Sequence, residues 1–94
     1  MSPSKNYHVK HILTQHKYEA EDLLKKLKNG IQFEDLAKKF SLCSSASAGG
    51  DLGLLKPGQA DEDFEAAAIK LKILEFSTEP VRTKFGYHLI LKLG

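Results

Sequence analysis

Four polar residues of this sequence have side chains that take part in active-site chemistry: His11, Cys43, Thr83 and His88. Each has an ordinary structural explanation when taken singly, because a lone cysteine is usually a small buried hydrophobe and threonine suits a strand by propensity alone. A glycine-rich run at residues 49–53 follows Cys43 and indicates a sharp turn or a close approach to the backbone. The chemistry that could use these features together decides how they are interpreted.

Spacing disfavours three familiar kinds of site. His8 and His11 are three residues apart on a predicted strand, so they point to opposite faces and cannot chelate one metal ion together. A cysteine hydrolase needs a base and an orienting group beside its thiol, and no recognisable nucleophile signature surrounds Cys43. The glycine run fits neither of the glycine-rich nucleotide-binding motifs. We therefore expect no metal ion and no cofactor.

Apolar periodicity predicts the elements that must position these residues. Residues 7–13 alternate, which predicts a strand with Tyr7, Val9 and His11 on one face. Apolar residues at helical spacing predict three helices, over residues 18–29, 33–40 and 61–71.

The rest of the chain reads as loops and short strands. Residues 41–53 are small and polar, which predicts a loop with at most one helical turn, and a short strand follows at 52–55. Val81, Thr83 and Phe85 share one parity on a further strand, which a glycine-containing turn joins to the last strand. Strands at both ends with helices between them predict an α+β domain with a mostly antiparallel sheet.

The composition fits one small cytoplasmic domain. We treat the 94 residues as a single domain, with residues 1–5 flexible and with a monomer expected. A net charge of +2 spread along the chain argues against an obligate nucleic-acid binder. One cysteine cannot form an intramolecular disulfide, and no apolar run reaches signal or membrane length. A cytoplasmic location without membrane association is therefore expected.

Seven short segments, each weak alone, together resemble one family. They are residues 11–13, 30–37, 40–45, 49–53, 58–59, 64–67 and 83–90. The sequence resembles the parvulin-type peptidyl-prolyl cis-trans isomerases, and in particular the small single-domain bacterial members. The resemblance implies a parvulin-like α+β fold, in which a four-stranded antiparallel sheet is surrounded by about four helices in the order βα3βαβ2.

The resemblance also implies roles for individual residues. It places His11 and His88 side by side at the sheet centre, in a hydrogen-bonded network with Cys43 and Thr83. The positions that it assigns to the pocket for the substrate proline are Leu52, Gln59, Ala60, Phe64 and Phe85.

Rotation about an X-Pro bond suits such a site. The barrier of a peptide bond is roughly 18–20 kcal/mol, and the uncatalysed exchange of X-Pro takes tens of seconds or more. No bond is made or broken, so neither a cofactor nor a nucleophile is required. A pocket that grips the ring, with polar groups that hold the twisted carbonyl, would stabilise the twisted state over either planar one. We therefore assign Cys43 a polar role and not covalent attack.

The sequence departs from the family pattern at several positions. Ala60 stands where methionine usually forms one wall of the pocket, which predicts a wider and shallower pocket. The acidic run 61–63 should disfavour acidic residues near the substrate proline. Leu74 stands where glycine is common, so that loop is expected to be built differently. Residues 14–17 lack the arginines of phosphate-directed parvulins, so no phosphoserine-proline specificity is expected.

Two functions stay open from the sequence, and a third is weak. The first is an active prolyl isomerase that acts on proline-containing, unfolded or flexible polypeptides, and the intact site residues favour it. The alternative is a non-catalytic, chaperone-like module that binds proline-containing or apolar peptides, which Ala60 favours slightly. Nucleic-acid association through the lysines of the first two helices is unlikely from their pattern, because acidic residues four positions earlier should pair with them.

Overall fold

A computed structural model describes residues 6–94, so the prediction that residues 1–5 are flexible lies outside the described residues. The described chain forms eight elements: β1 Tyr7–Thr14, α1 Lys17–Lys28, α2 Phe33–Phe40, the 3-10 helix η1 Ser44–Ala48, β2 Asp51–Leu55, α3 Glu62–Lys70, β3 Val81–Thr83 and β4 Gly86–Lys92. With η1 counted as the third helix, this is the predicted order βα3βαβ2. The predicted fold class is confirmed.

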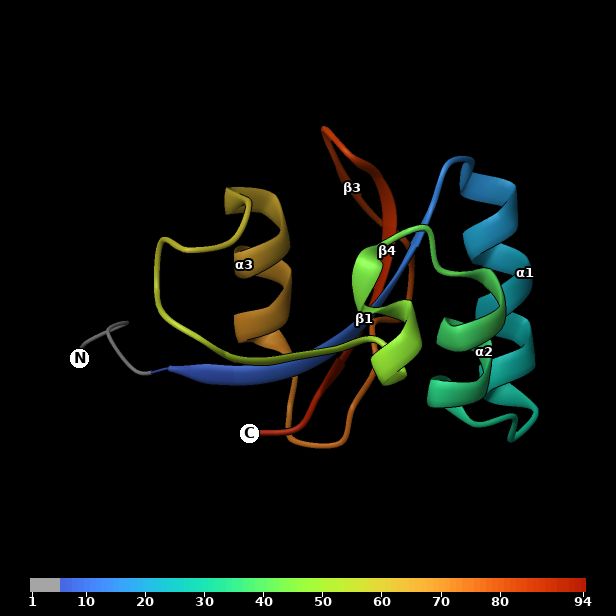
Figure 1. The fold of residues 1–94 in the computed structure, drawn as a ribbon, viewed down its shortest axis with the longest axis horizontal. Coiled ribbons are helices and arrows are strands. Elements are labelled where there is room, and N and C mark those ends of the chain that lie inside the picture. The colour runs from blue at the N-terminus through green and yellow to red at the C-terminus, as the bar shows by residue number, and fades with distance from the viewer. Residues whose placement is uncertain (1–5) are drawn as a thin grey trace.

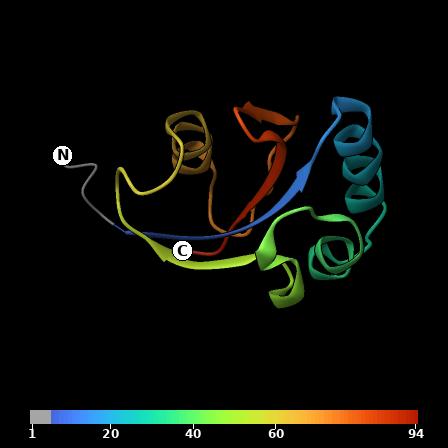
Figure 2. The same cartoon turned by 45° about the horizontal axis from the view of Figure 1, so that its top comes forward.

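The four strands form one antiparallel sheet in the order β2-β1-β4-β3. The strands nearest the two ends of the chain, β1 and β4, are therefore neighbours at its centre. Helices α1 and α2 cover one face of the sheet and α3 covers the other (Figure 1). The turned view in Figure 2 shows the curved sheet between these two layers.

The predicted alternation of β1 is confirmed, because each face of this strand enters a separate core. Ile12 packs with Leu89 of β4 against α1 and α2. Tyr7 and Val9 pack on the other side with Ile90 and with residues of α3. The second face is the one that His11 shares by parity, so β1 directs His11 toward α3.

The charges on the first two helices pair differently from the prediction. Asp22 contacts Lys26 one turn later, with 3.4 Å between Oδ2 and Nζ, as expected. Glu34 instead contacts Lys10 of β1 at 3.1 Å. The prediction for Glu34 was wrong because α2 packs beside β1, where the largely buried Lys10 of the sheet lies within reach.

The hairpin β3–β4 corrects the prediction for Phe85. Thr83 pairs with Gly86, so Lys84 and Phe85 form the two-residue connection between the strands. Phe85 is therefore in the turn and not on a strand, and its side chain is 62% exposed.

Gly50 and Gly53 of the 49–53 run have positive φ angles, which residues with side chains rarely adopt. Gly50 has φ +86°, and its carbonyl accepts a hydrogen bond from the His11 N–H at 2.9 Å. A Cβ at Gly50 would collide with the His11 carbonyl oxygen. The register of β1 against β2 shifts by one residue near Gly53, which has φ +71° and open space around it. The run therefore presses the loop against the strand that carries His11 and places a bulge in β2.

The 71–75 loop holds its backbone in a conformation that suits glycine. Leu74 has φ +70° and is the one non-glycine residue with a positive φ among residues 6–94. Its N–H donates a hydrogen bond of 2.6 Å to the Lys92 carbonyl, which ties the loop to the end of β4. The loop thus keeps this strained conformation despite carrying leucine.

We expect Leu74→Gly to raise the free energy of unfolding by about 0.5–1 kcal/mol. A left-handed φ costs a non-glycine residue roughly 1–2 kcal/mol, and the greater freedom of glycine in the unfolded chain takes back roughly 0.4–1 kcal/mol. Urea denaturation measures the change.

Ile73→Gly is the matched control for this prediction. Ile73 is 65% exposed against 72% for Leu74, and it has no positive φ. This variant should lower the free energy of unfolding. Equal effects of the two substitutions would contradict the explanation by backbone strain.

Candidate active site

The site is built on two buried histidines on neighbouring strands. His11 of β1 faces Ile90 of β4, and His88 is two residues before Ile90, so the two histidines are diagonal neighbours on one sheet face. Their Nδ1 atoms are 3.0 Å apart, and their rings stack with centroids 5.2 Å apart. The ring of Phe64 from α3 meets both histidines nearly at right angles.

A chain of hydrogen bonds leads from the hairpin to the first strand. Thr83 Oγ1 accepts the Phe85 N–H at 3.1 Å, which leaves its own hydrogen free to donate to His88 Nε2 at 2.7 Å. In that tautomer, His88 Nδ1–H donates to His11 Nδ1, and His11 carries its proton on Nε2. If His88 Nε2–H instead donated to Thr83, the buried Thr83 hydroxyl hydrogen would have no acceptor, in addition to the unpartnered His11 Nε2. The first direction of donation is therefore favoured.

The end of this chain is a buried nitrogen. His11 Nε2 has no hydrogen-bond partner among the described residues and is shielded from solvent. Burial, and to a smaller extent the neighbouring His88, lower the pKa of His11 to about 4. Burial also lowers the pKa of His88 to about 4, against an opposing effect of the Asp61 charge. Both rings are therefore neutral at pH 7.

Cys43 lies beside the histidines but outside their hydrogen-bond chain. Burial raises the pKa of the Cys43 thiol, but the polar groups of the neighbouring Ser45 and Ser44 lower it by more, so the net shift is downward. Within residues 6–94, the structure records no hydrogen bond between Cys43 and either histidine. The expected four-residue network is thus corrected to three residues, His11, His88 and Thr83.

The predicted binding residues surround one pocket of about 530 Å³. Eight of the nine predicted site residues line it, namely His11, Cys43, Leu52, Gln59, Ala60, Phe64, Phe85 and His88. Thr83 does not line the pocket and instead supports His88 from behind. The apolar side chains form the walls, and the neutral histidines lie at the pocket base.

Sequence reasoning missed three further lining residues, Leu13, Leu55 and Lys84. Leu13 shares the strand parity of His11, and Lys84 directly precedes Phe85, so both could have been found. Asp61, already named as part of the acidic run, lines the pocket too. The rim therefore carries a positive and a negative charge, and is not purely acidic.

The turn that carries Gln59 and Ala60 is fixed from two directions. Glu65 Oε1 of α3 accepts hydrogen bonds from the Gly58 N–H and from the Tyr7 hydroxyl, both at 2.9 Å. The Gln59 side chain accepts the Lys56 N–H at 2.9 Å within the same turn. Glu65 thus holds one pocket wall against the start of β1.

The structure gives no sign of a metal centre in the part of the chain that it describes. Residues 6–94 contain no group of three or more His, Cys, Asp or Glu side chains that could hold a metal ion. His8, which lies on the opposite strand face from His11 as predicted, contacts Asp51 at 2.7 Å. No helix within these residues is long and apolar enough to cross a membrane.

We expect the histidine pair to make the fold less stable as the pH falls from about 6.5 to about 4. The pKa of each ring is about 4 in the folded chain against an ordinary 6.5. In this window the unfolded chain binds protons that the folded chain does not, so stability present above pH 6.5 is lost. The loss is on the order of 1 kcal/mol per pH unit for each ring.

Ring resonances in NMR, followed together with urea unfolding at each pH, measure this behaviour. The resonances of His11 and His88 should stay constant down to about pH 5. A titration of either ring near its ordinary pKa would contradict a neutral pair at the pocket base.

Comparisons with known proteins agree with this geometry. Residues 4–93 match the rotamase family, described as the PPIC-type PPIase domain. The foldase protein PrsA of Bacillus subtilis (strain 168) is 58% identical over 83 residues, which cover 87% of this chain and 28% of that protein. The chain thus spans little more than a quarter of that relative.

Solved structures share the whole fold. The peptidylprolyl isomerase PrsA from Bacillus anthracis matches with a TM-score of 0.94 and 41% identity, over 97% of this chain and 42% of the other. NmPin, the parvulin of Nitrosopumilus maritimus, matches with a TM-score of 0.85 and 41% identity, over 99% of this chain and all of the other. The chain therefore belongs to the PPIC-type peptidyl-prolyl cis-trans isomerase family, the parvulins.

Proposed function

We propose that this domain isomerises X-Pro bonds in unfolded or flexible polypeptides, without a covalent intermediate. The observation that carries the proposal is an apolar pocket whose base is a pair of neutral, buried histidines. Leu52 of β2, Phe64 of α3 and Phe85 of the β3–β4 turn can grip the proline ring from three sides. A pocket wide enough for the ring and free of charge at its base suits a twisted amide, whose dipole is smaller than that of the planar form.

Polar groups at the pocket wall can donate hydrogen bonds to the carbonyl oxygen of the twisted amide. Cys43 Sγ–H is a weak donor, and the amide of Gln59 has an N–H₂ group whose carbonyl is already used within its own turn. His11 Nε2 is shielded from solvent, so the histidines act by holding the pocket base and not by contacting the carbonyl. Catalysis then comes from stronger contacts in the twisted state than in the planar states.

The surroundings of Cys43 support a mechanism without a nucleophile. A catalytic thiol needs a base within hydrogen-bond reach and a third group that orients the base. The described residues place both histidines in a chain with Thr83, and neither histidine is hydrogen-bonded to the thiol.

A chaperone-like binding module is the second candidate. Ala60 leaves one wall of the pocket short, and Phe85 exposes 62% of its side chain at the pocket mouth. Such an open apolar site can hold a chain segment without stabilising the twisted amide.

We further propose a monomer in a reducing, cytoplasmic compartment, without nucleic-acid partners and without a phosphoserine requirement. The single cysteine, the spread of charge and the two-residue connection between β1 and α1 support these proposals. Size-exclusion chromatography with light scattering tests the monomer, and equal exchange rates on Ser-Pro and phosphoserine-Pro peptides test the last proposal.

Exchange NMR on X-Pro peptides, which needs no protease, tests the isomerase and its mechanism together. We expect the wild-type protein to accelerate cis/trans exchange. Cys43→Asp should keep most of this acceleration, because aspartate retains a polar group at the pocket wall. If the wild-type protein binds the peptides, as chemical-shift changes would show, but does not accelerate exchange, the chaperone-like module is favoured. If the wild-type protein is active and Cys43→Asp is inactive, Cys43 acts as a nucleophile.

Ala60→Met tests the short pocket wall. We expect kcat/KM for apolar X-Pro peptides to rise about fivefold, because part of a methionine side chain is then buried against the ring. Ala66→Met is the matched control, since Ala66 is an exposed residue of α3 outside the pocket. If the two variants behave alike, Ala60 does not limit the pocket.

A further inference from the structure

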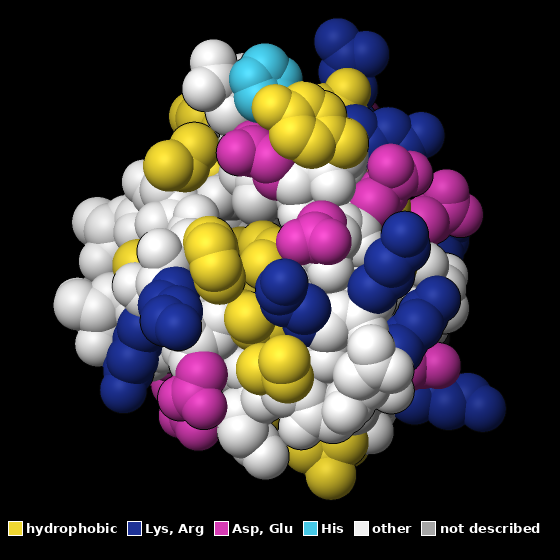
Figure 3. Space-filling model, turned by 90° about the vertical axis from the view of Figure 1, so that its right-hand side faces the viewer, with side chains coloured by type: hydrophobic (Ala, Val, Ile, Leu, Met, Phe, Trp, Pro, Cys, Tyr) yellow, Lys and Arg dark blue, Asp and Glu magenta, His cyan; other side chains and the backbone are white. Residues whose placement is uncertain are grey.

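A second apolar depression lies between the first two helices, on the side of the molecule that Figure 3 faces, where hydrophobic side chains gather between charged ones. We call it the α1–α2 groove, and its volume is about 600 Å³. Tyr18 and Leu23 of α1, Phe40 of α2 and Leu42 of the following loop supply its apolar lining. Tyr18 and Leu42 are 68% and 64% exposed, so this apolar surface is open to solvent.

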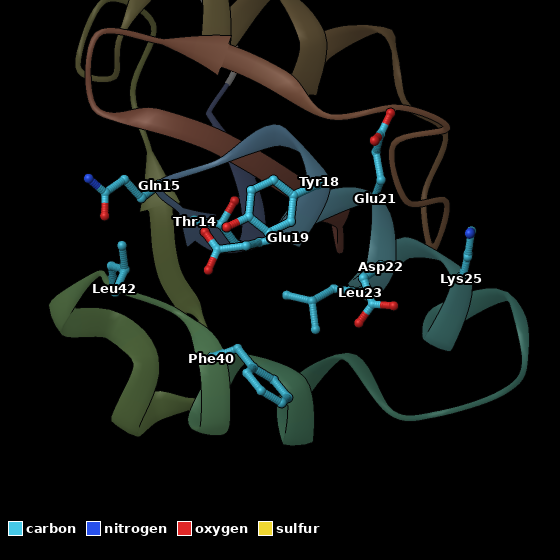
Figure 4. Close-up of a pocket in the computed structure, with 10 residues that line it drawn as sticks. All are labelled: Thr14, Gln15, Tyr18, Glu19, Glu21, Asp22, Leu23, Lys25, Phe40 and Leu42. Atoms are coloured by element: carbon cyan, nitrogen blue, oxygen red, sulfur yellow. The ribbon is translucent and has the colours of Figure 1, made fainter.

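Figure 4 shows how these side chains are arranged around the groove. The side chains of α1 lie on one side and Phe40 of α2 lies on the other, with Leu42 at one end and Lys25 at the opposite end. The lining residues are therefore spread from Leu42 at one end to Lys25 at the other, an arrangement that suits an extended chain segment.

The groove and the proline pocket lie on opposite faces of the sheet and are lined by neighbouring residues of one loop. Leu42 lines the groove, and the next residue, Cys43, lines the proline pocket. The Leu42 N–H donates a hydrogen bond of 2.9 Å to the carbonyl of Leu13, which itself lines the proline pocket. One short loop segment, fixed to β1, thus separates the two depressions.

The charge of the groove is negative. Three carboxylates, of Glu19, Glu21 and Asp22, line it together with one ammonium group, of Lys25. Asp22 contacts Lys26, but Glu21 forms no ion pair within the described residues. A segment with a lysine or arginine beside a large apolar residue would therefore complement the groove in both charge and polarity.

We propose that the α1–α2 groove holds the part of the substrate polypeptide that flanks the isomerised proline, and that it selects an apolar residue next to a basic one. This inference rests on the proposed isomerase function. Phe40 and Cys43 are three residues apart, so their Cα atoms are separated by at most about 11 Å. Because the groove and the proline pocket lie on opposite faces of the sheet, a substrate segment that passes over this loop needs at least about four extended residues to reach both.

Peptide length separates this proposal from the isomerase function itself. Exchange NMR would compare a blocked four-residue X-Pro peptide with longer peptides that carry Phe-Lys about four residues before or after the proline. We expect one of the longer peptides to have a KM about fivefold lower than the short one, with kcat unchanged. A longer peptide with Ser-Glu in place of Phe-Lys should have the same KM as the short peptide.

Two groove variants and one control then locate the effect. Tyr18→Ala should return the KM of the Phe-Lys peptide to that of the short peptide, without changing turnover of the short peptide. Glu21→Lys should raise the KM of the Phe-Lys peptide and lower the KM of the Ser-Glu peptide. Leu54→Ala, which truncates a 68% exposed apolar residue outside both depressions, should change the KM of neither peptide.

Chemical-shift titration makes failures distinguishable. If no peptide is isomerised, the proposed function fails, but shifts of the Tyr18 and Phe40 amides with the Phe-Lys peptide alone would still support the groove. Equal effects of Tyr18→Ala on short and long peptides would overturn the inference. Shifts of these amides that depend on protein concentration without peptide would also overturn it, because a second copy would then occupy the groove.

Discussion

The pairing of β1 with β4 is the constraint on which the rest of this structure depends. It joins the two ends of the described chain at the sheet centre, with His11 opposite Ile90 and Leu13 opposite His88. Because side chains alternate along a strand, a slip of one residue in this register would turn one histidine away from the other. The same pairing brings Ile12 beside Leu89 on the opposite face, so the core under α1 and α2 fixes the register that the site needs.

The histidine pair shows how burial and hydrogen bonding act together. Burial keeps both rings neutral, and a neutral ring can accept on one nitrogen and donate on the other. Thr83 sets the direction of donation through the pair, because the Phe85 N–H already occupies an acceptor site of its hydroxyl. A turn residue at the pocket mouth is thereby linked to the orientation of the pocket base.

The parts of the pocket differ in how firmly the structure holds them. The base is buried and hydrogen-bonded, and the wall at Gln59 and Ala60 is held by Glu65. The mouth is formed by Phe85, whose side chain is largely exposed and lies near the Lys84 ammonium group. Substrate selection is therefore expected to depend on the mouth and on the neighbouring groove, since these parts meet the residues that flank proline.

The sequence alone determined the elements and most of the pocket. Periodicity placed α2 at its observed bounds, and the resemblance placed eight of the nine predicted residues around one cavity. Local patterns carry this information because amphipathic spacing and turn glycines report the local backbone.

Only the tertiary structure decided which residues meet. It left Cys43 outside the histidine chain, paired Glu34 with Lys10 and moved Phe85 into a turn. It also made a groove from Tyr18, Phe40 and Leu42, which lie on two helices and on the loop that follows them. These contacts depend on strand register and on how helices pack across the sheet, and neither is encoded in the spacing of residues along one element.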